Sequence, residues 1–193
     1  YERHGGASPL LEATEERIKP PLQFPMRLPV IPLGIDAASL AAGDRVRGRA
    51  AAGIPIDHTV LLYSGRFSAH DKMDLFPLLH AFSRVLAACP DTPLTLLMAG
   101  SRQGAPYIDM LQVMARGLGI EQHVMFLPDF DEESKADIYA AADVFVSPCD
   151  NPQETFGLTV VEAMAAGLPV VVSDYDGYRD TVPDSVGVRI PTY

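Results

Sequence analysis

The chain has 193 residues, of which 48% are hydrophobic and 21% charged, so it is long enough for one well-buried domain. Its formal net charge is −10, and no basic stripe runs through it, which argues against a nucleic acid as the partner. No apolar run reaches the roughly 18 residues that a membrane-spanning helix needs.

The amino-terminal part differs in composition from the rest. Residues 1–27 are rich in charge, Pro and Gly, and we expect an arm or interdomain linker there. We expect a single domain over 28–193. It opens with a short edge-like strand at 30–34 that contains a proline, followed by a stretch with helical spacing at 37–52.

From residue 59 onward, apolar runs alternate with segments of helical periodicity. The predicted strands are 59–64, 94–99, 124–127, 144–146 and 170–172, with a sixth at 186–190. The predicted helices are 74–88, 107–118, 132–142 and 159–166. Strands that are apolar throughout are typical of a parallel sheet covered on both faces. We therefore predict an α/β fold with a Rossmann-like parallel sheet, in which ligands bind beyond the carboxyl ends of the strands.

Two cations follow the strand at 59–64. Gly65 permits a tight turn at the strand end, Arg66 comes next, and Lys72 lies six residues beyond it. Arginine can bind a phosphate through two hydrogen bonds and lysine adds a point charge, so the pair suggests a diphosphate site. The alternative is that Arg66 pairs with Asp71 or Asp74 on the surface.

Two acids flank the start of the predicted helix at 159–166. Glu154 precedes the helix and Glu162 lies inside it, where an acid is costly unless something pairs with it. A carboxylate at position 162 can accept two hydrogen bonds from a vicinal diol such as a ribose, and Glu154 could bind sugar hydroxyls. Thr159 and Glu162 also fit a helix capping box, which the spacing alone favours.

The loop between the two acids is a candidate anion site. Phe156, Gly157 and Leu158 would present backbone N–H groups at the amino end of the helix, and Gly157 leaves room for close approach.

Other common site patterns are absent from the sequence. Cys89 and Cys149 have no metal or redox spacing and are expected to be reduced thiols. The five histidines show no metal-ligand spacing, and His70 is read as a solvated loop residue. The glycine fingerprint of dinucleotide sites, the Walker phosphate loop and the nucleophile elbow are missing too. We therefore expect neither a metal nor a cofactor.

Taken together, these residues resemble the retaining glycosyltransferases of family four, also called glycosyltransferase group one. Residues 30–36 look like the segment that opens the carboxyl-terminal domain of these enzymes. Gly65 and Arg66 with Lys72 look like their phosphate motif, and 99–101 resembles the turn after the next strand. Residues 154–162 fit their paired-glutamate motif. The resemblance covers roughly residue 28 to the end.

The resemblance implies one half of a GT-B fold, in which two Rossmann-like domains face each other across a cleft. By resemblance, Arg66 and Lys72 hold the donor diphosphate, Glu162 holds the ribose hydroxyls, and Glu154 contacts the donor sugar and stabilises its developing positive charge. The residues expected near the phosphates and nucleoside are Phe156, Gly157, Leu158 and Thr159. The resemblance thus favours a binding role for Glu162 over the capping box.

The implied function is donor binding for a retaining, metal-independent glycosyltransferase that uses a nucleotide-diphosphate sugar. The implied partner is an amino-terminal acceptor domain, absent from this chain, which would make any peripheral membrane contact. We expect a cytoplasmic location and a chain that binds donor without transferring sugar. The alternatives are a nucleotide-sugar epimerase or phosphorylase of the same architecture, or a non-catalytic nucleotide-binding domain. The presence of Arg66, Lys72, Glu154 and Glu162 together argues against the last.

Overall fold

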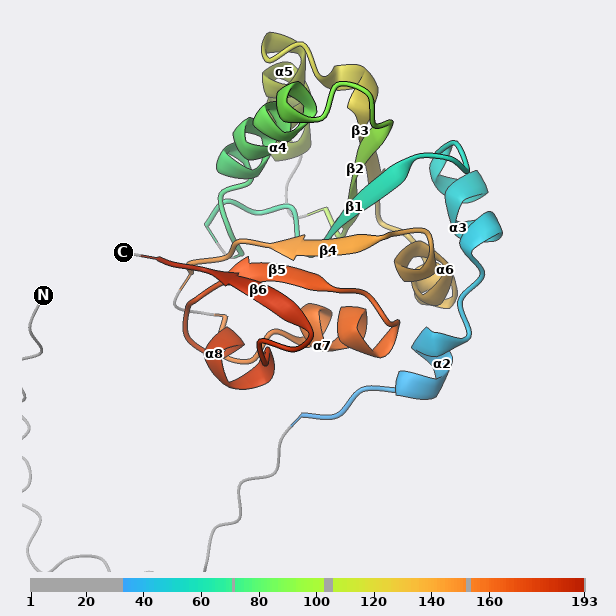
Figure 1. Cartoon of the computed structure of the whole chain (residues 1–193), viewed down its shortest axis with the longest axis vertical. Helices are drawn as coiled ribbons and strands as arrows, with labels where there is room; N and C mark the ends of the chain where they lie inside the picture. The colour runs from blue at the N-terminus through green and yellow to red at the C-terminus, as the bar shows by residue number, and fades with distance from the viewer. Residues whose placement is uncertain (1–32, 71, 103–105, 152–153, 193) are drawn as a thin grey trace, which may run out of the picture. The chain divides into compact units, whose positions relative to one another are not determined.

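The computed structural model describes residues 33–70, 72–102, 106–151 and 154–192 (Figure 1). The predicted arm at 1–27 and most of the predicted strand at 30–34 lie outside these ranges, and the predicted domain start at residue 28 stays a prediction. Gly34–Tyr193 form one unit, and every contact reported below lies within it.

Six strands form one parallel sheet in the order β3-β2-β1-β4-β5-β6. Their bounds are β1 Thr59–Ser64, β2 Leu94–Gly100, β3 Val124–Pro128, β4 Val144–Ser147, β5 Val170–Ser173 and β6 Gly187–Ile190. All five strand pairings are parallel, which confirms the predicted Rossmann-like α/β fold. The strand order reverses between β1 and β4, and in such sheets the ligand crevice lies at that point.

The helices cover both faces of the sheet. Their bounds are α2 Ala37–Ala41, α3 Arg45–Ala52, α4 Phe76–Ala88, α5 Pro106–Gly117, α6 Lys135–Ala140, α7 Leu158–Ala165 and α8 Tyr178–Thr181. Helices α4 and α5 lie on one face, and α6 and α7 on the other (Figure 1), as right-handed crossovers require. Within the described ranges, no helix has the length and apolar character needed to cross a bilayer.

The stretch at 37–52 that the spacing predicts as helical forms two helices, α2 and α3, separated by a turn. A Cβ on Gly43 would lie 2.1 Å from the carbonyl oxygen of Ala136, so the backbones touch there and only glycine fits. Asp44 then caps α3, accepting hydrogen bonds from two backbone N–H groups of its first turn at 2.8 and 2.9 Å.

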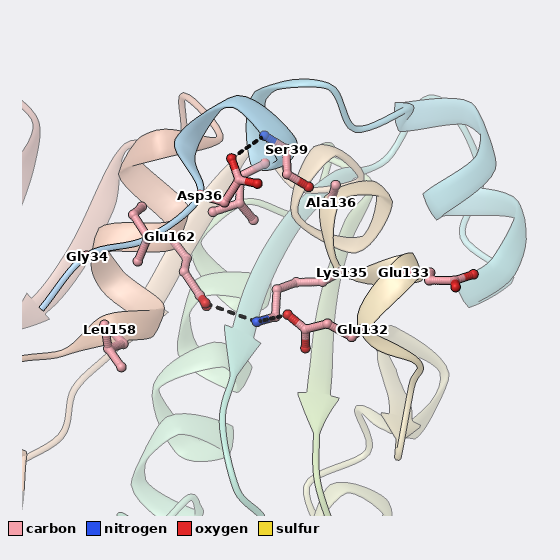
Figure 2. Close-up of a pocket in the computed structure, with 11 residues that line it drawn as sticks. Gly34, Asp36, Ser39, Glu132, Glu133, Lys135, Ala136, Leu158 and Glu162 are labelled. Atoms are coloured by element: carbon pink, nitrogen blue, oxygen red, sulfur yellow. Dashed lines mark hydrogen bonds and ion pairs between the residues drawn. The ribbon is translucent and has the colours of Figure 1, made fainter.

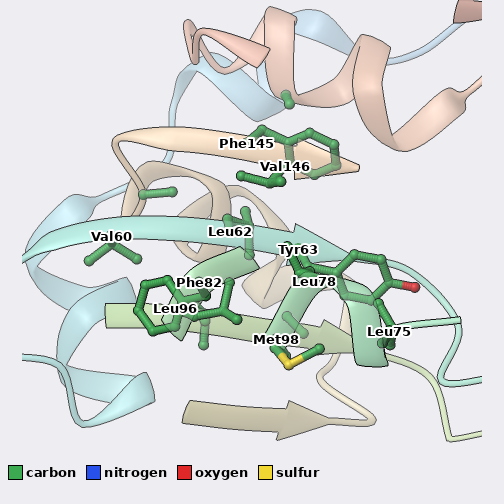
Figure 3. Packing of buried hydrophobic residues seen from close by; sticks show 14 of the residues in the cluster. Val60, Leu62, Tyr63, Leu75, Leu78, Phe82, Leu96, Met98, Phe145 and Val146 are labelled. Atoms are coloured by element: carbon green, nitrogen blue, oxygen red, sulfur yellow. The ribbon is translucent and has the colours of Figure 1, made fainter. Parts of the chain in front are cut away.

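The core lies on both faces of the sheet, and Figure 3 shows the part of it around β1, β2, β4 and α4. Strand β2 is buried along its whole length, as its unbroken apolar run predicts. Leu78 and Phe82 of α4 are buried within the same cluster as Leu62 of β1 and Phe145 of β4. This packing fixes the carboxyl ends of β1 and β4, where the candidate site lies.

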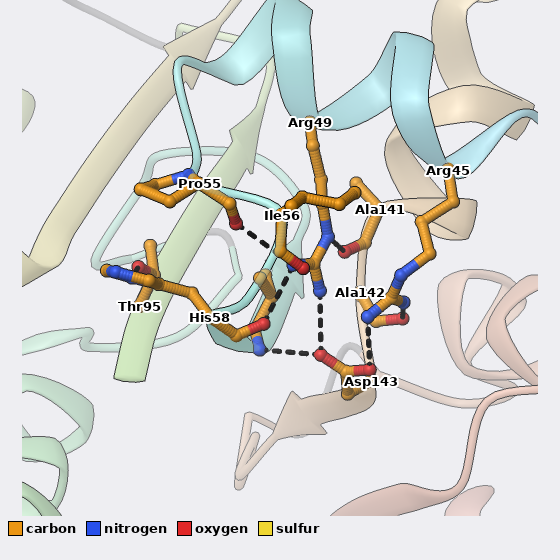
Figure 4. Close-up of polar contacts among 10 residues, drawn as sticks. Arg45, Arg49, Pro55, Ile56, His58, Thr95, Ala141, Ala142 and Asp143 are labelled. Carbon is orange, nitrogen blue, oxygen red and sulfur yellow. Dashed lines mark hydrogen bonds and ion pairs between the residues drawn. The ribbon is translucent and has the colours of Figure 1, made fainter. Parts of the chain in front are cut away.

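A buried arginine joins the amino ends of β1 and β4 (Figure 4). Only 1% of Arg49 is exposed, and its guanidinium pairs with Asp143 at 2.9 Å. It also donates to the backbone carbonyls of Pro55, Ile56, His58 and Ala141. Asp143 accepts in turn from the N–H of Val60 at 2.8 Å, so one ion pair holds the segments that lead into both strands.

Replacing Arg49 with Leu should therefore lower the free energy of unfolding by about 3–5 kcal/mol, because buried acceptors lose their partner. Arg47→Leu is the matched control: that side chain is 67% exposed and pairs with Asp137, and its loss should cost less than about 1 kcal/mol. Urea unfolding measures both. Equal losses in the two variants would contradict the role given to Arg49.

Candidate functional site

The loop after β1 is fixed by a close backbone contact with the end of β2. The N–H of Gly65 donates to the carbonyl of Ala99 at 3.0 Å, and a Cβ on Gly100 would lie 1.6 Å from the oxygen of Gly65. The buried hydroxyl of Tyr63 donates to the carbonyl of Arg66 at 3.0 Å. Burial raises the pKa of Tyr63, so this hydroxyl stays protonated. The Arg66 side chain is exposed at the carboxyl edge.

Lys72 meets Glu154 across the crevice. The ammonium of Lys72 pairs with the carboxylate of Glu154, and the two side chains are only 11% and 12% exposed. Two further hydrogen bonds join the loops that carry them. The thiol of Cys149 donates to the backbone carbonyl of Lys72 at 3.1 Å, and the side-chain amide of Asn151 donates to the backbone carbonyl of His70 at 2.9 Å. The loop after β1 and the loop after β4 therefore form one rim.

Cys89 is exposed and Cys149 is buried, and the two are not joined to each other. His70 is exposed and takes part through its carbonyl. Asp71, one proposed surface partner of Arg66, lies outside the described residues. In the part of the chain that the structure covers, no group of three or more His, Cys, Asp and Glu residues is arranged to hold a metal ion.

Helix α7 begins on a glycine with left-handed backbone. Gly157 has a φ of 82°, and its carbonyl accepts from the N–H groups of Val160 and Val161 at 3.0 and 3.1 Å. Leu158, the first helical residue, is exposed, whereas Phe156 is half-buried. The loop that was predicted as an anion site therefore lies directly at the amino end of the helix.

The capping-box alternative is wrong. Helix α7 starts at Leu158 with Gly157 as its amino-terminal cap, so Thr159 is already the second helical residue. Its hydroxyl oxygen is buried and has no hydrogen-bond partner among the described residues. Glu162 points toward α6 instead. The spacing of two residues within one helix cannot reveal such a contact with another helix.

Glu162 is held by two residues of α6. The ammonium of Lys135 lies 3.0 Å from one carboxylate oxygen of Glu162, and the hydroxyl of Tyr139 donates to the other at 2.9 Å. Lys135 also pairs with Glu132 at 2.6 Å. The Tyr139 ring stacks on Phe145 of β4, with centroids 6.1 Å apart. Helix α6 thus fixes both oxygens of the carboxylate.

Protonation in this cluster is set by its charges. Burial lowers the pKa of Lys135, but the carboxylates of Glu132 and Glu162 outweigh it and raise the pKa above its ordinary value. Burial, and then the charge of Glu162, raises the pKa of Tyr139. Lys135 therefore stays an ammonium and Tyr139 a hydrogen-bond donor at neutral pH.

Lys135 and Tyr139 were not predicted from the sequence. They lie four residues apart on a predicted helix and so share one face, which is the signal that could have identified them.

A cavity of about 390 Å³ opens beside Glu162, between α2, α6 and α7 (Figure 2). Leu158 and Glu162 line it from α7, while Arg66, Lys72 and Glu154 do not. Its charged lining residues are Asp36, Glu132, Glu133, Glu162 and Lys135. With four carboxylates and one ammonium, the cavity suits a neutral ligand rich in hydrogen-bond donors rather than a phosphate.

The eight predicted site residues thus fall into two groups that are joined by one continuous segment of chain. Arg66, Lys72 and Glu154 lie at the rim made by the loops after β1 and β4, and Glu162 lies one turn into α7 beside the cavity. The loop and helix start that include Phe156, Gly157, Leu158 and Thr159 connect the two ends. A larger, mostly apolar cavity of about 650 Å³ lies between α4 and the sheet, away from Glu162.

The chain is similar in sequence and in fold to known proteins. D-inositol 3-phosphate glycosyltransferase of Geodermatophilus obscurus is 39% identical over 166 residues, which are 84% of this chain and 36% of the relative. Sucrose-phosphate synthase from Thermosynechococcus elongatus superposes with a TM-score of 0.68 at 28% identity, over 83% of this chain and 39% of that one.

A second similar structure was solved with a ligand. Anabaena Alr3699/HepE, in complex with UDP and glucose, has a TM-score of 0.66 at 25% identity, over 82% of this chain and 41% of its own. Among the curated relatives that it matches, the chain spans little more than a third of their length. The family described as glycosyl transferases group 1 matches residues 44–193, and the chain belongs to this family.

Proposed function

We propose that this chain is the donor-binding domain of a retaining, metal-independent glycosyltransferase that moves a sugar from a nucleotide-diphosphate sugar to an acceptor. The observation that carries the proposal is the division of charge along α7. The rim before the helix carries two cations, Arg66 and Lys72, and one carboxylate, Glu154, whereas the cavity beside its first turns carries four carboxylates and one ammonium. A nucleotide sugar has the matching division, with an anionic diphosphate next to a neutral, hydroxyl-rich nucleoside.

The diphosphate would lie at the rim. Arg66 and Lys72 are the cations there, and the N–H groups of Leu158 and Thr159, the first two of α7, would donate to a phosphate oxygen. Gly157 carries no side chain, which lets the loop backbone lie directly against Tyr178. A phosphate that binds Lys72 competes with Glu154 for its ammonium, so donor binding loosens the ion pair that the two residues form.

The nucleoside would lie toward the cavity beside α7. Glu162 accepts one hydrogen bond on each carboxylate oxygen from α6, and each oxygen keeps capacity for a second donor. Two adjacent acceptors match the two hydroxyls of a ribose. Because Lys135 and Tyr139 fix the carboxylate before the ligand arrives, little side-chain ordering remains for binding.

Glu154 would act on the donor sugar. As the bond from the anomeric carbon to the phosphate breaks, positive charge develops on the sugar, and a carboxylate that is only 12% exposed stabilises that charge more than one in water. The acceptor oxygen then bonds to the same carbon, and its proton passes to the departing phosphate oxygen. Attack from the face that the phosphate leaves retains the configuration.

The relatives support a second domain for the acceptor, since this chain corresponds to just over a third of their length. HepE, which was solved with UDP and glucose, supports a uridine nucleotide as the first donor to test. An epimerase of the same architecture would change its nucleotide sugar without an acceptor, and a non-catalytic domain would bind a nucleotide and leave it unchanged.

Arg66→Ala should weaken the binding of UDP by about 1.5–3 kcal/mol, the range for a hydrogen bond to a charged group, and should leave the fold intact. Calorimetric titration with UDP, GDP and ADP, with and without magnesium, measures the change. Arg84→Ala is the matched control, because Arg84 is exposed on α4 beyond its first turns. Unchanged affinity in Arg66→Ala would rule out the phosphate role of this side chain.

Glu162→Gln should weaken UDP binding by about 1–3 kcal/mol and leave the binding of pyrophosphate, which has no ribose, unchanged. Glutamine keeps an oxygen acceptor for Tyr139, so the melting temperature should move little. If both ligands lose affinity equally, Glu162 does not distinguish the ribose end. A large loss of stability with unchanged UDP binding would show that Glu162 is structural.

The isolated chain should bind the nucleotide and show no sugar transfer, because the acceptor domain that we propose lies outside the part of the relatives that this chain matches. Incubation with UDP-glucose and candidate acceptors, followed by mass spectrometry of the products, tests this expectation. Turnover by the chain alone would refute it, and conversion of the nucleotide sugar without an acceptor would favour the epimerase.

A further inference from the structure

Tyr178 lies directly behind the loop at the amino end of α7. It is the first residue of α8 and is 1% exposed. Its hydroxyl lies 2.9 Å from the hydroxyl of Ser147, the fully buried last residue of β4. The ring is therefore anchored to the end of the strand from which the candidate site loop departs.

The backbone of that loop contacts the Tyr178 ring and also Gly177, the residue before it. A Cβ on Gly157 would lie 2.4 Å from Cε1 and 2.8 Å from Cδ1 of Tyr178. On the other side of the turn, a Cβ on Gly177 would lie 2.1 Å from the carbonyl oxygen of Thr155. The loop thus has no space to settle toward α8.

This contact matters for α7 because Gly157 sets the direction in which the helix starts. Its left-handed φ of 82° and its two hydrogen bonds to Val160 and Val161 orient the first helical turn. A loop that could sink into the space of the Tyr178 ring would turn the N–H groups of Leu158 and Thr159 away from the crevice. Such a movement of the loop would also shift Glu154. Burial raises the pKa of Tyr178, and the nearby charge of Glu154 raises it further.

We propose that Tyr178 is a positioning residue for diphosphate binding: its ring holds the Thr155–Gly157 backbone so that the amino end of α7 meets the phosphates of a nucleotide sugar. This inference rests on the proposed donor-binding function. It assigns the role to the ring, because the ring contacts Gly157, and gives the hydroxyl only the secondary task of holding the ring against Ser147.

Two substitutions of Tyr178 distinguish the role of its ring from the role of its hydroxyl. Tyr178→Phe keeps the ring and removes only the bond to Ser147, so the affinity for UDP should stay within about twofold of the unchanged chain. Tyr178→Leu removes the support under Gly157 and should weaken UDP binding about tenfold or more. Phe82→Leu is the matched control, since it removes a buried ring from α4 that lines the apolar cavity between α4 and the sheet.

Gly177→Ala tests the same loop without disturbing the core. Gly177 has an ordinary helical φ of −58°, so alanine adds no backbone strain, but its methyl group must displace the carbonyl of Thr155. We expect a loss of UDP affinity of at least fivefold. This variant also keeps the proposal testable if Tyr178→Leu does not fold.

The experiment is a calorimetric titration of all five proteins with UDP, GDP and ADP at a temperature where circular dichroism shows each variant fully folded. The expected result is binding by the unchanged chain, Tyr178→Phe and Phe82→Leu, with weaker binding by Tyr178→Leu and Gly177→Ala. Unchanged affinity in the last two would overturn the role of Tyr178 and leave the donor site standing. If the unchanged chain bound none of the three nucleotides, the proposed function itself would fail, and this role with it.

Discussion

The pairing of β1 with β4 is the constraint on which the rest of the structure depends. These strands lie side by side through Leu61–Val144 and Leu62–Phe145, although about 80 residues separate them in the sequence. At their amino ends, the buried pair of Arg49 and Asp143 holds the segments that enter both strands. At their carboxyl ends, the chain leaves in two loops toward opposite faces of the sheet, and the crevice between those loops brings Lys72 to Glu154.

Both glutamates of the predicted site are paired with a cation before any ligand binds. Lys72 pairs with Glu154, and Lys135 pairs with Glu162. In a chain with a net charge of −10, such local pairing lets cations remain at a largely buried edge. The two pairs are not equivalent, since a phosphate would compete for Lys72, whereas a ribose would add to the bonds that Glu162 already makes.

Much of the fold could be predicted because short, unbroken apolar runs such as 94–99, which alternate with helical segments, favour buried strands of a parallel sheet. The break at Gly43 escaped prediction because its cause is a contact with Ala136, far along the chain. Helix α8 was missed because four residues carry no periodicity. The site residues were found through motif spacing, but their partners were not. The spacing of Thr159 and Glu162 favours a capping box, and only the contacts of Glu162 with Lys135 and Tyr139 of α6 show otherwise. A tertiary contact of that kind leaves no local pattern.

The most direct test of the account is the location of nucleotide binding on the chain. In a nuclear magnetic resonance titration of the isotopically labelled chain with UDP, the account predicts that amide shifts concentrate at Gly65, Arg66 and 157–162. Amides along the apolar cavity between α4 and the sheet, such as those of Leu78 and Val85, should not move. Shifts centred on that cavity, or none at millimolar nucleotide, would contradict the claim that the edge between β1 and β4 binds the donor.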